Sequence, residues 1–236
     1  MIGFNCERGF MKKIIYIIFV FALVFIVSGC GKTDSVKFKK EYENLNGKIA
    51  SSDNKYQDIS IPKKNPIKYA TAEEIIDLIK NGSGVIYFGF PECPWCRMAV
   101  PALLESAEKI GIEEILYMNM TDERDTLSID KNGDIITEKK GTVGYKKLLE
   151  ALEEYLDDYN VNDKDGNSIF TGEKRIYVPL VIFVRNGKII GTHADTIPVQ
   201  DENPYMVLNS SQKEELLNIY LELMNQINMC DDTPGC

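Results

Sequence analysis

Two cysteines three positions apart, Cys93 and Cys96, occupy the stretch YFGFPECPWCRMAVP. The β-branched and aromatic run before them, residues 85–90, predicts a short buried strand, and the apolar spacing after them predicts an amphipathic helix that ends near Gly111. Residues 115–120 predict a second strand. A strand, a crossover helix and a strand form a right-handed unit with parallel strands, so the cysteine pair is expected where the first strand passes into the helix.

The remaining apolar patterns complete an α/β domain with a central mixed sheet flanked by helices. The expected elements are helices over residues 71–81, 143–156 and 210–229 and an antiparallel strand pair over residues 178–184 and 188–192. Residues 121–142 and 157–175 each contain an Asn-Gly or Asp-Gly turn. We expect these two segments to be inserted hairpins.

Composition narrows the classes of function. The chain has 236 residues, of which 44% are hydrophobic, and this is enough to bury one core. Its formal net charge of −9 repels polyanions, so no nucleic-acid partner is expected. The only histidine is His193, which excludes metal sites built from several histidines.

The N-terminal region predicts export. Lys12 and Lys13 precede an unbroken apolar run over residues 14–27, which is shorter than the roughly 20 residues of a comfortable membrane span. The following IVSGC resembles a bacterial lipobox, which implies that Cys30 is linked to diacylglycerol and anchors the chain in the lipid bilayer. An uncleaved membrane anchor is the alternative. Both place the rest of the chain on the outer face of the cytoplasmic membrane, because the two lysines stay inside.

The chain therefore divides into five expected parts. These are an upstream extension (1–10), a signal peptide with lipobox (11–29), a lipid-anchored tether with an edge segment near residues 56–61 (30–66), the α/β domain (67–229) and a cysteine-bearing tail (230–236).

The position of the cysteine pair predicts redox chemistry. A helix N-terminus supplies free N–H groups and a positive dipole end, which lower a cysteine pKa from ~8.5 to between ~3.5 and ~7.5. Cys93 is therefore expected to be the nucleophile, and Cys96, one helical turn further, the thiol that attacks the mixed disulfide. Pro94 suits the first helical position, and Trp95 is expected to line the substrate face.

Two segments resemble the thioredoxin family. PECPWCRMAVP is similar to its active-site segment, and VPLVIFVRNGKIIG is similar to the segment that carries its cis-proline. The resemblance implies a thioredoxin fold with Pro179 cis and facing Cys93, and a Val178 backbone that pairs with substrate. It also implies a thiol-disulfide oxidoreductase that needs no cofactor. The implied substrates are cysteine-containing exported proteins or peptides, and the implied redox partner is a membrane or extracytoplasmic protein. The two insertions and the tail are closest to the bacteriocin transport accessory and bacteriocin-maturation branch.

One position departs from that family. Tyr87 stands where the family carries a buried acid that accepts the proton of the second cysteine, and a phenol with a pKa near ~10 is a poor base at neutral pH. Glu92 or water is an alternative acceptor. The direction of electron flow stays open.

Other interpretations of the cysteines remain. Cys93 and Cys96 could form a zinc clip with Cys230 and Cys236, or an inert structural disulfide, although no metal is expected. A non-catalytic binding or chaperone lipoprotein, which would use the Pro179 groove, is the alternative function.

The tail CDDTPGC contains a Pro-Gly turn between Cys230 and Cys236. We expect these residues to form a small-loop disulfide in an oxidising compartment. Free thiols, or a second redox pair that relays electrons to the first, are the alternatives.

Overall fold

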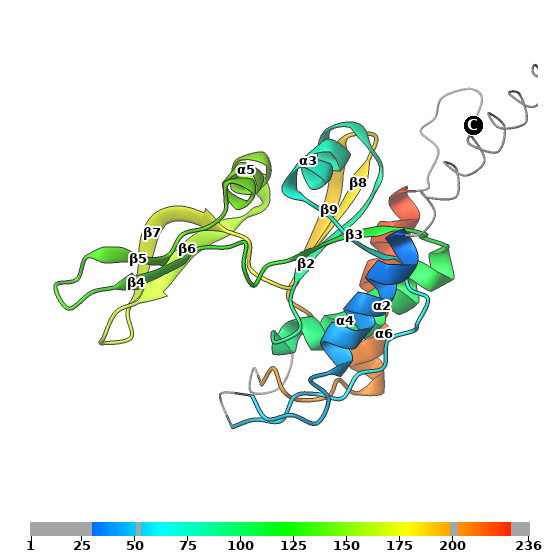
Figure 1. Ribbon diagram of the computed structural model, residues 1–236, viewed down its shortest axis with the longest axis horizontal. Coiled ribbons are helices and arrows are strands. Elements are labelled where there is room, and N and C mark those ends of the chain that lie inside the picture. Colours follow the sequence, from blue (N-terminus) through cyan, green and yellow to red (C-terminus); the bar gives the residue numbers. More distant parts are fainter. Residues whose placement is uncertain (1–29, 51–52, 199–202, 228–236) are drawn as a thin grey trace, which may run out of the picture.

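A five-stranded mixed sheet forms the centre of the computed structural model, which describes residues 30–50, 53–198 and 203–227 (Figure 1). Its order is β1-β3-β2-β8-β9, with β1, β3 and β2 parallel and β8 and β9 each antiparallel to its preceding neighbour. The strands are β1 Ile67–Tyr69, β2 Gly84–Gly89, β3 Ile115–Asn119, β8 Leu180–Arg185 and β9 Lys188–Ala194. The predicted mixed sheet is confirmed.

Helices cover both faces of this sheet, as the sequence predicts. Alternate residues of β2 point to opposite sides: Val85 and Tyr87 into one core, Ile86 and Phe88 into the other. The first core contains residues of α2 (Cys30–Glu43), α4 (Pro94–Ile110) and α6 (Ser210–Ile227). The second contains residues of α3 (Ala72–Asn81) and α5 (Val143–Leu152).

Local signals set the ends of these helices. Thr71 and Glu74 form a capping box at the start of α3. Gly111 ends α4 in the left-handed conformation at φ 81°. Helix α5 is shorter than the predicted 143–156, because the chain tightens into the 3-10 turn η1, Glu153–Tyr155, before the next strand begins.

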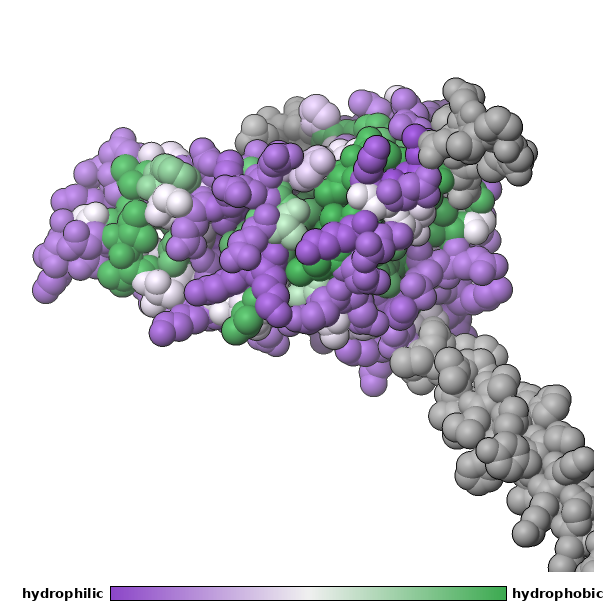
Figure 2. Space-filling view, turned by 90° about the horizontal axis from the view of Figure 1, so that it is seen from above, coloured by the Kyte–Doolittle hydropathy of each residue, from purple (hydrophilic) through white to green (hydrophobic). Residues whose placement is uncertain are grey.

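Both insertions form the predicted hairpins. The first pairs β4 (Thr126–Ile129) with β5 (Ile135–Lys139), and the second pairs β6 (Asp157–Asn162) with β7 (Ser168–Arg175). The hairpins lie together, with β4 against β6, and extend away from the helices α2, α4 and α6 (Figure 1). Seen from above, hydrophobic side chains gather on the surface of these hairpins (Figure 2).

The expectation of a tether over residues 30–66 requires correction. The segment begins with α2, and its Phe38 and Tyr42 are fully buried in the core. These two residues lie four positions apart, so they share the helix face that packs on the sheet, although the composition around them is polar. Residues 56–61 form no strand. Instead Ile59 and Ile61 are buried in the core beside α2 and α4.

A buried arginine joins this N-terminal segment to α4. The Arg97 side chain is fully buried and donates to the backbone oxygens of Tyr42 at 2.7 Å and of Gln57 at 2.6 Å. It also donates to Asn46 Oδ1 at 2.7 Å. The guanidinium thus hydrogen-bonds to α2, to the turn that follows it and to the chain at Gln57. These buried bonds make the N-terminal segment part of the domain.

Several expectations fall outside the described residues. They are the extension, the signal peptide, and the tail cysteines Cys230 and Cys236. Cys30 is the first residue of α2, and its side chain is not described. Within the described ranges no helix has the length and apolar character to cross a bilayer.

Candidate active site

Cys93 is the N-cap residue of α4, at the carboxyl end of β2. Its Sγ accepts a hydrogen bond from the backbone N–H of Cys96 at 3.2 Å, so the sulfur satisfies one of the free donors of the helix N-terminus. Pro94 occupies the first helical position, where a missing N–H costs nothing. Both cysteines are free thiols.

Both thiols are buried, Cys93 with 6% and Cys96 with 0% of its surface exposed, and they differ in acidity. The pKa of Cys93 lies below its ordinary value, chiefly because the Cys96 thiol donates a hydrogen bond to its sulfur, with help from the backbone N–H of Cys96 and the charge of Arg124. The pKa of Cys96, which is fully buried, lies well above its ordinary value because burial disfavours the thiolate and the Cys93 sulfur repels it. The lowered pKa gives Cys93 the character of a nucleophile, whereas the raised pKa keeps Cys96 protonated.

The Val178-Pro179 peptide bond is cis, as predicted. The Cys93 thiol donates to the carbonyl oxygen of Val178 at 3.6 Å. Val178 and Pro179 therefore lie beside the nucleophile, at the start of β8, and this predicted juxtaposition is confirmed.

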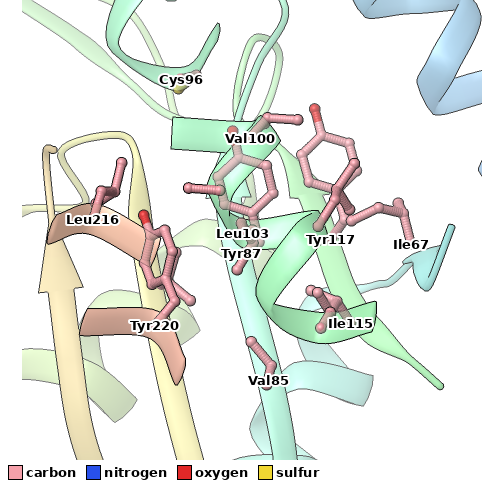
Figure 3. Close-up of a cluster of buried hydrophobic side chains, with 14 of the residues drawn as sticks. Ile67, Val85, Tyr87, Cys96, Val100, Leu103, Ile115, Tyr117, Leu216 and Tyr220 are labelled. Carbon is pink, nitrogen blue, oxygen red and sulfur yellow. The ribbon is translucent and has the colours of Figure 1, made fainter. Parts of the chain in front are cut away.

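Tyr87 lies beneath Cys96, with its hydroxyl end toward that sulfur (Figure 3). The hydroxyl shares a 2.9 Å hydrogen bond with that of Tyr42 from α2, and both side chains are fully buried. Burial raises the pKa of Tyr87 well above its ordinary value, while its hydrogen bond to Cys96 lowers the pKa of that thiol. Tyr87 is thus a donor that stabilises a Cys96 thiolate, and not a base that removes its proton at neutral pH.

Gly89 makes room for this tyrosine. A Cβ at Gly89 would overlap the Tyr87 phenol, and the Gly89 carbonyl accepts a hydrogen bond from Tyr117 at 3.3 Å. The rings of Tyr87 and Tyr117 stack at 5.3 Å between centroids. The tyrosine pair below Cys96 is therefore fixed in position by packing.

Arg124 belongs to the site and was missed by the sequence analysis. Its guanidinium lies 4.9 Å from the centre of the Phe90 ring, and the Phe90 carbonyl accepts the N–H of Cys93 at 3.2 Å. The positive charge favours a Cys93 thiolate and lowers its pKa. A signal did exist: Arg124 follows β3, and the parallel strands β2 and β3 end at the same edge of the sheet.

Trp95 is partly buried against the core that contains α4, so it contributes to packing as well as to the surface near Cys93. Its backbone N–H also hydrogen-bonds to the Cys93 sulfur. Glu92, the proposed alternative proton acceptor, is exposed.

Comparisons with known proteins give no assignment. No protein-family model matches the chain, and no curated protein matches it. In the described part of the chain no group of three His, Cys, Asp or Glu side chains could hold a metal ion. The zinc interpretation would also need Cys230 and Cys236, which lie outside it.

Proposed function

We propose that this protein is a thiol-disulfide oxidoreductase of thioredoxin fold that cycles Cys93 and Cys96 between dithiol and disulfide. One observation carries the proposal: an acidic thiol at a helix N-cap touches the carbonyl before a cis-proline, and a second thiol of raised pKa lies one turn behind it. The sheet order and the cis-proline beside the cysteines are compatible with the thioredoxin fold.

The reaction proceeds in two exchanges. The Cys93 thiolate attacks one sulfur of a substrate disulfide, and the released sulfur leaves as a thiolate that takes up a proton. Cys96 then loses its proton to solvent or to the departing thiolate, and its sulfur attacks Cys93. The bond between Cys93 and substrate breaks, and the second substrate thiolate leaves. Two electrons pass from the cysteine pair to the substrate disulfide, and the reverse order oxidises a substrate dithiol.

The Val178 carbonyl fits the first exchange. It lies 3.6 Å from Cys93 Sγ, so an extended peptide that pairs with this backbone places its own sulfur near the nucleophile. We propose that the substrates are cysteine-containing exported proteins or peptides, that a separate thiol-disulfide partner restores the starting state, and that Cys30 carries the lipid anchor. The bacteriocin-related branch is the narrower proposal.

The alternative of a non-catalytic binding lipoprotein leaves the contrast between the two thiols without a role. A measurement of turnover distinguishes the enzyme from the binding protein. Insulin reduction by dithiothreitol, or refolding of scrambled ribonuclease, is measured for wild type, Cys93→Ser and Cys96→Ser.

We expect Cys93→Ser to abolish turnover and Cys96→Ser to accumulate mixed disulfides at Cys93. Wild-type protein that performs no better than Cys93→Ser would refute the enzyme and favour the binding protein.

A further inference from the structure

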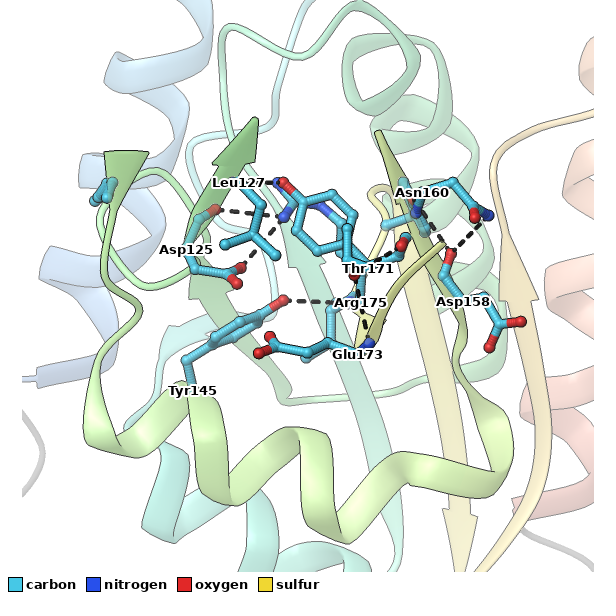
Figure 4. A network of polar contacts seen from close by, with 12 residues as sticks. Asp125, Leu127, Tyr145, Asp158, Asn160, Thr171, Glu173 and Arg175 are labelled. Carbon is cyan, nitrogen blue, oxygen red and sulfur yellow. Dashed lines mark hydrogen bonds and ion pairs between the residues drawn. The ribbon is translucent and has the colours of Figure 1, made fainter. Parts of the chain in front are cut away.

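The two hairpins form one structure that is fixed at its base. We name it the hairpin arm, residues 126–139 and 157–175. Arg175 of β7 donates from Nη1 to Asp125, the residue before β4, to the backbone oxygen at 3.3 Å and to Oδ1 at 3.2 Å (Figure 4). The two side chains are only 9% and 12% exposed. Such a desolvated ion pair fixes how the hairpins meet, because separating them would leave a buried charge without a partner.

Contacts of Tyr159 on β6 add to this base, two within the second hairpin and one across to the first. The Arg175 guanidinium lies 4.0 Å from the centre of the Tyr159 ring. The Tyr159 hydroxyl accepts the N–H of Leu127 at 3.0 Å, and its carbonyl accepts the Thr171 hydroxyl at 2.8 Å. The hydrogen bond between Leu127 and Tyr159 thus joins the two hairpins, and the other two contacts hold the second hairpin together.

Farther out the arm exposes an apolar patch. Its members are on β5 and β7 and are 37–52% exposed: Ile135, Ile136, Ile169 and Phe170. Figure 2 shows hydrophobic side chains on the surface of the hairpins. Consecutive residues of a strand point to opposite faces, so each hairpin exposes apolar side chains on both of its faces. Apolar side chains that gather on the surface of a fixed element indicate binding.

A chain of neighbouring and hydrogen-bonded residues links the patch to the neighbourhood of Cys93. Val178, whose carbonyl accepts the Cys93 thiol, follows Tyr177. The Tyr177 hydroxyl accepts the N–H of Asn160 at 3.3 Å, and Asn160 pairs with Phe170 in the β6-β7 ladder. This path from sulfur to patch spans on the order of 20 Å, which about six residues of extended chain can cover.

Charge argues against two other occupants. Each hairpin turn carries two aspartates and one lysine, Asp130, Lys131 and Asp134 in the first turn and Asp163, Lys164 and Asp165 in the second. These net negative tips repel an anionic lipid surface, and the chain's net charge of −9 opposes association with a second copy.

We propose that the hairpin arm is a docking surface for the polypeptide whose disulfide reacts at Cys93, and that it binds apolar side chains about six residues from the reacting cysteine. This inference rests on the proposed redox function and names its substrate class: incompletely folded chains, which still expose apolar side chains. A small disulfide reacts at Cys93 without reaching the arm.

The test compares two substrates in the full-length protein. Ile136→Ser with Phe170→Ser removes one exposed apolar side chain from each hairpin, and neither side chain belongs to the buried core. The control is Val36→Ser on α2, which is 41% exposed against 40% for Ile136. For each protein kcat/KM is measured with scrambled ribonuclease and with a small aromatic disulfide. We expect the ratio of the two values to fall about tenfold for the double variant, the effect of losing partial burial of two large apolar groups, and to stay at the wild-type value for the control.

The other outcomes distinguish failure of the docking surface from failure of the redox function. A ratio equal to wild type overturns the docking surface, and so does wild-type dimerisation that the double variant abolishes, because the patch would then bind a second copy. Equal activity of wild type and Cys93→Ser on the small disulfide would instead refute the redox function itself.

A trapping experiment is independent of how well the double variant folds. Cys96→Ser protein forms a mixed disulfide with a peptide that carries a photo-crosslinker six residues from its cysteine. Crosslinks on residues 135–136 or 169–170 support the arm, and crosslinks elsewhere overturn it.

Discussion

Replacing Tyr87 by Phe should slow the second exchange and leave the first almost unchanged. A hydrogen bond from the Tyr87 hydroxyl lowers the pKa of Cys96, whereas other groups, chiefly the Cys96 thiol, lower the pKa of Cys93. A hydrogen bond to a charged group contributes about 1.5–3 kcal/mol, so its loss reduces the thiolate fraction of Cys96 about 10- to 100-fold below its pKa. A more basic thiolate is also a better nucleophile, which recovers about half of that loss on a logarithmic scale. The net expectation is a second exchange slower by about 3- to 10-fold.

Ellman's reagent resolves the two exchanges by stopped-flow absorbance. The first thionitrobenzoate is released when Cys93 attacks, and the second when Cys96 attacks. The second phase of Tyr87→Phe should reach its plateau rate at higher pH than in wild type, because removing the donor raises the pKa of Cys96 further. The first phase should keep its rate, since the groups that lower the pKa of Cys93 remain.

Tyr220→Phe is the matched control. Tyr220 is also fully buried, on α6, and its hydroxyl has no hydrogen-bond partner among the described residues. Its removal should leave both phases at wild-type rates. A second phase slowed equally in both variants, or in neither, would refute the role given to the Tyr87 hydroxyl.

Three further predictions concern charge in and around the site. Arg124→Gln should raise the pKa of Cys93 and slow its alkylation by iodoacetamide at neutral pH about threefold, with Arg124→Lys close to wild type and the difference reduced by salt. Asp125→Ala should destabilise the protein by about 3–5 kcal/mol in urea unfolding, because Arg175 keeps a buried charge without its partner; an unchanged midpoint would contradict the buried ion pair. The reduced protein should lose stability as pH rises above ~8.5, since the unfolded chain then releases the Cys96 proton while the fold retains it; Cys96→Ala should flatten this slope in urea titrations at pH 8 to 10.

The sequence was most informative where the signal is local. Cys93, Pro94 and Gly111 have their structural roles within one helix, so spacing and capping rules were sufficient to predict them. The contact between Pro179 and Cys93 is long-range, and it was predicted only through the resemblance of two segments to one family.

Long-range contacts made by unremarkable residues were not predictable in this way. Phe38 and Tyr42 are two apolar residues in a polar stretch, and only the packing of α2 on the sheet shows that they belong to the core. Arg124 is one charge in a charged insertion, and its closeness to Phe90 depends on where the first hairpin leaves the sheet. The spacing of residues along the sequence does not reveal that α2 packs on the sheet or that Arg124 lies near Phe90.

Helix α2, which stands where a tether was expected, also determines how far the lipid anchor would lie from the redox site. Tyr42, near the carboxyl end of α2, reaches the redox site through Tyr87, whereas Cys30 begins the helix. If Cys30 carries lipid as we propose, helix geometry separates anchor and site by about 18 Å along the axis, whereas a flexible 30–66 tether could extend beyond ~100 Å. Trp95 is the only tryptophan and lies beside Cys93, so its energy transfer to a headgroup acceptor in vesicles reports this separation. We expect measurable transfer for the lipidated protein and its loss when a long Gly-Ser segment is inserted directly after Cys30. Equal transfer in both proteins would show that α2 does not act as a rigid spacer.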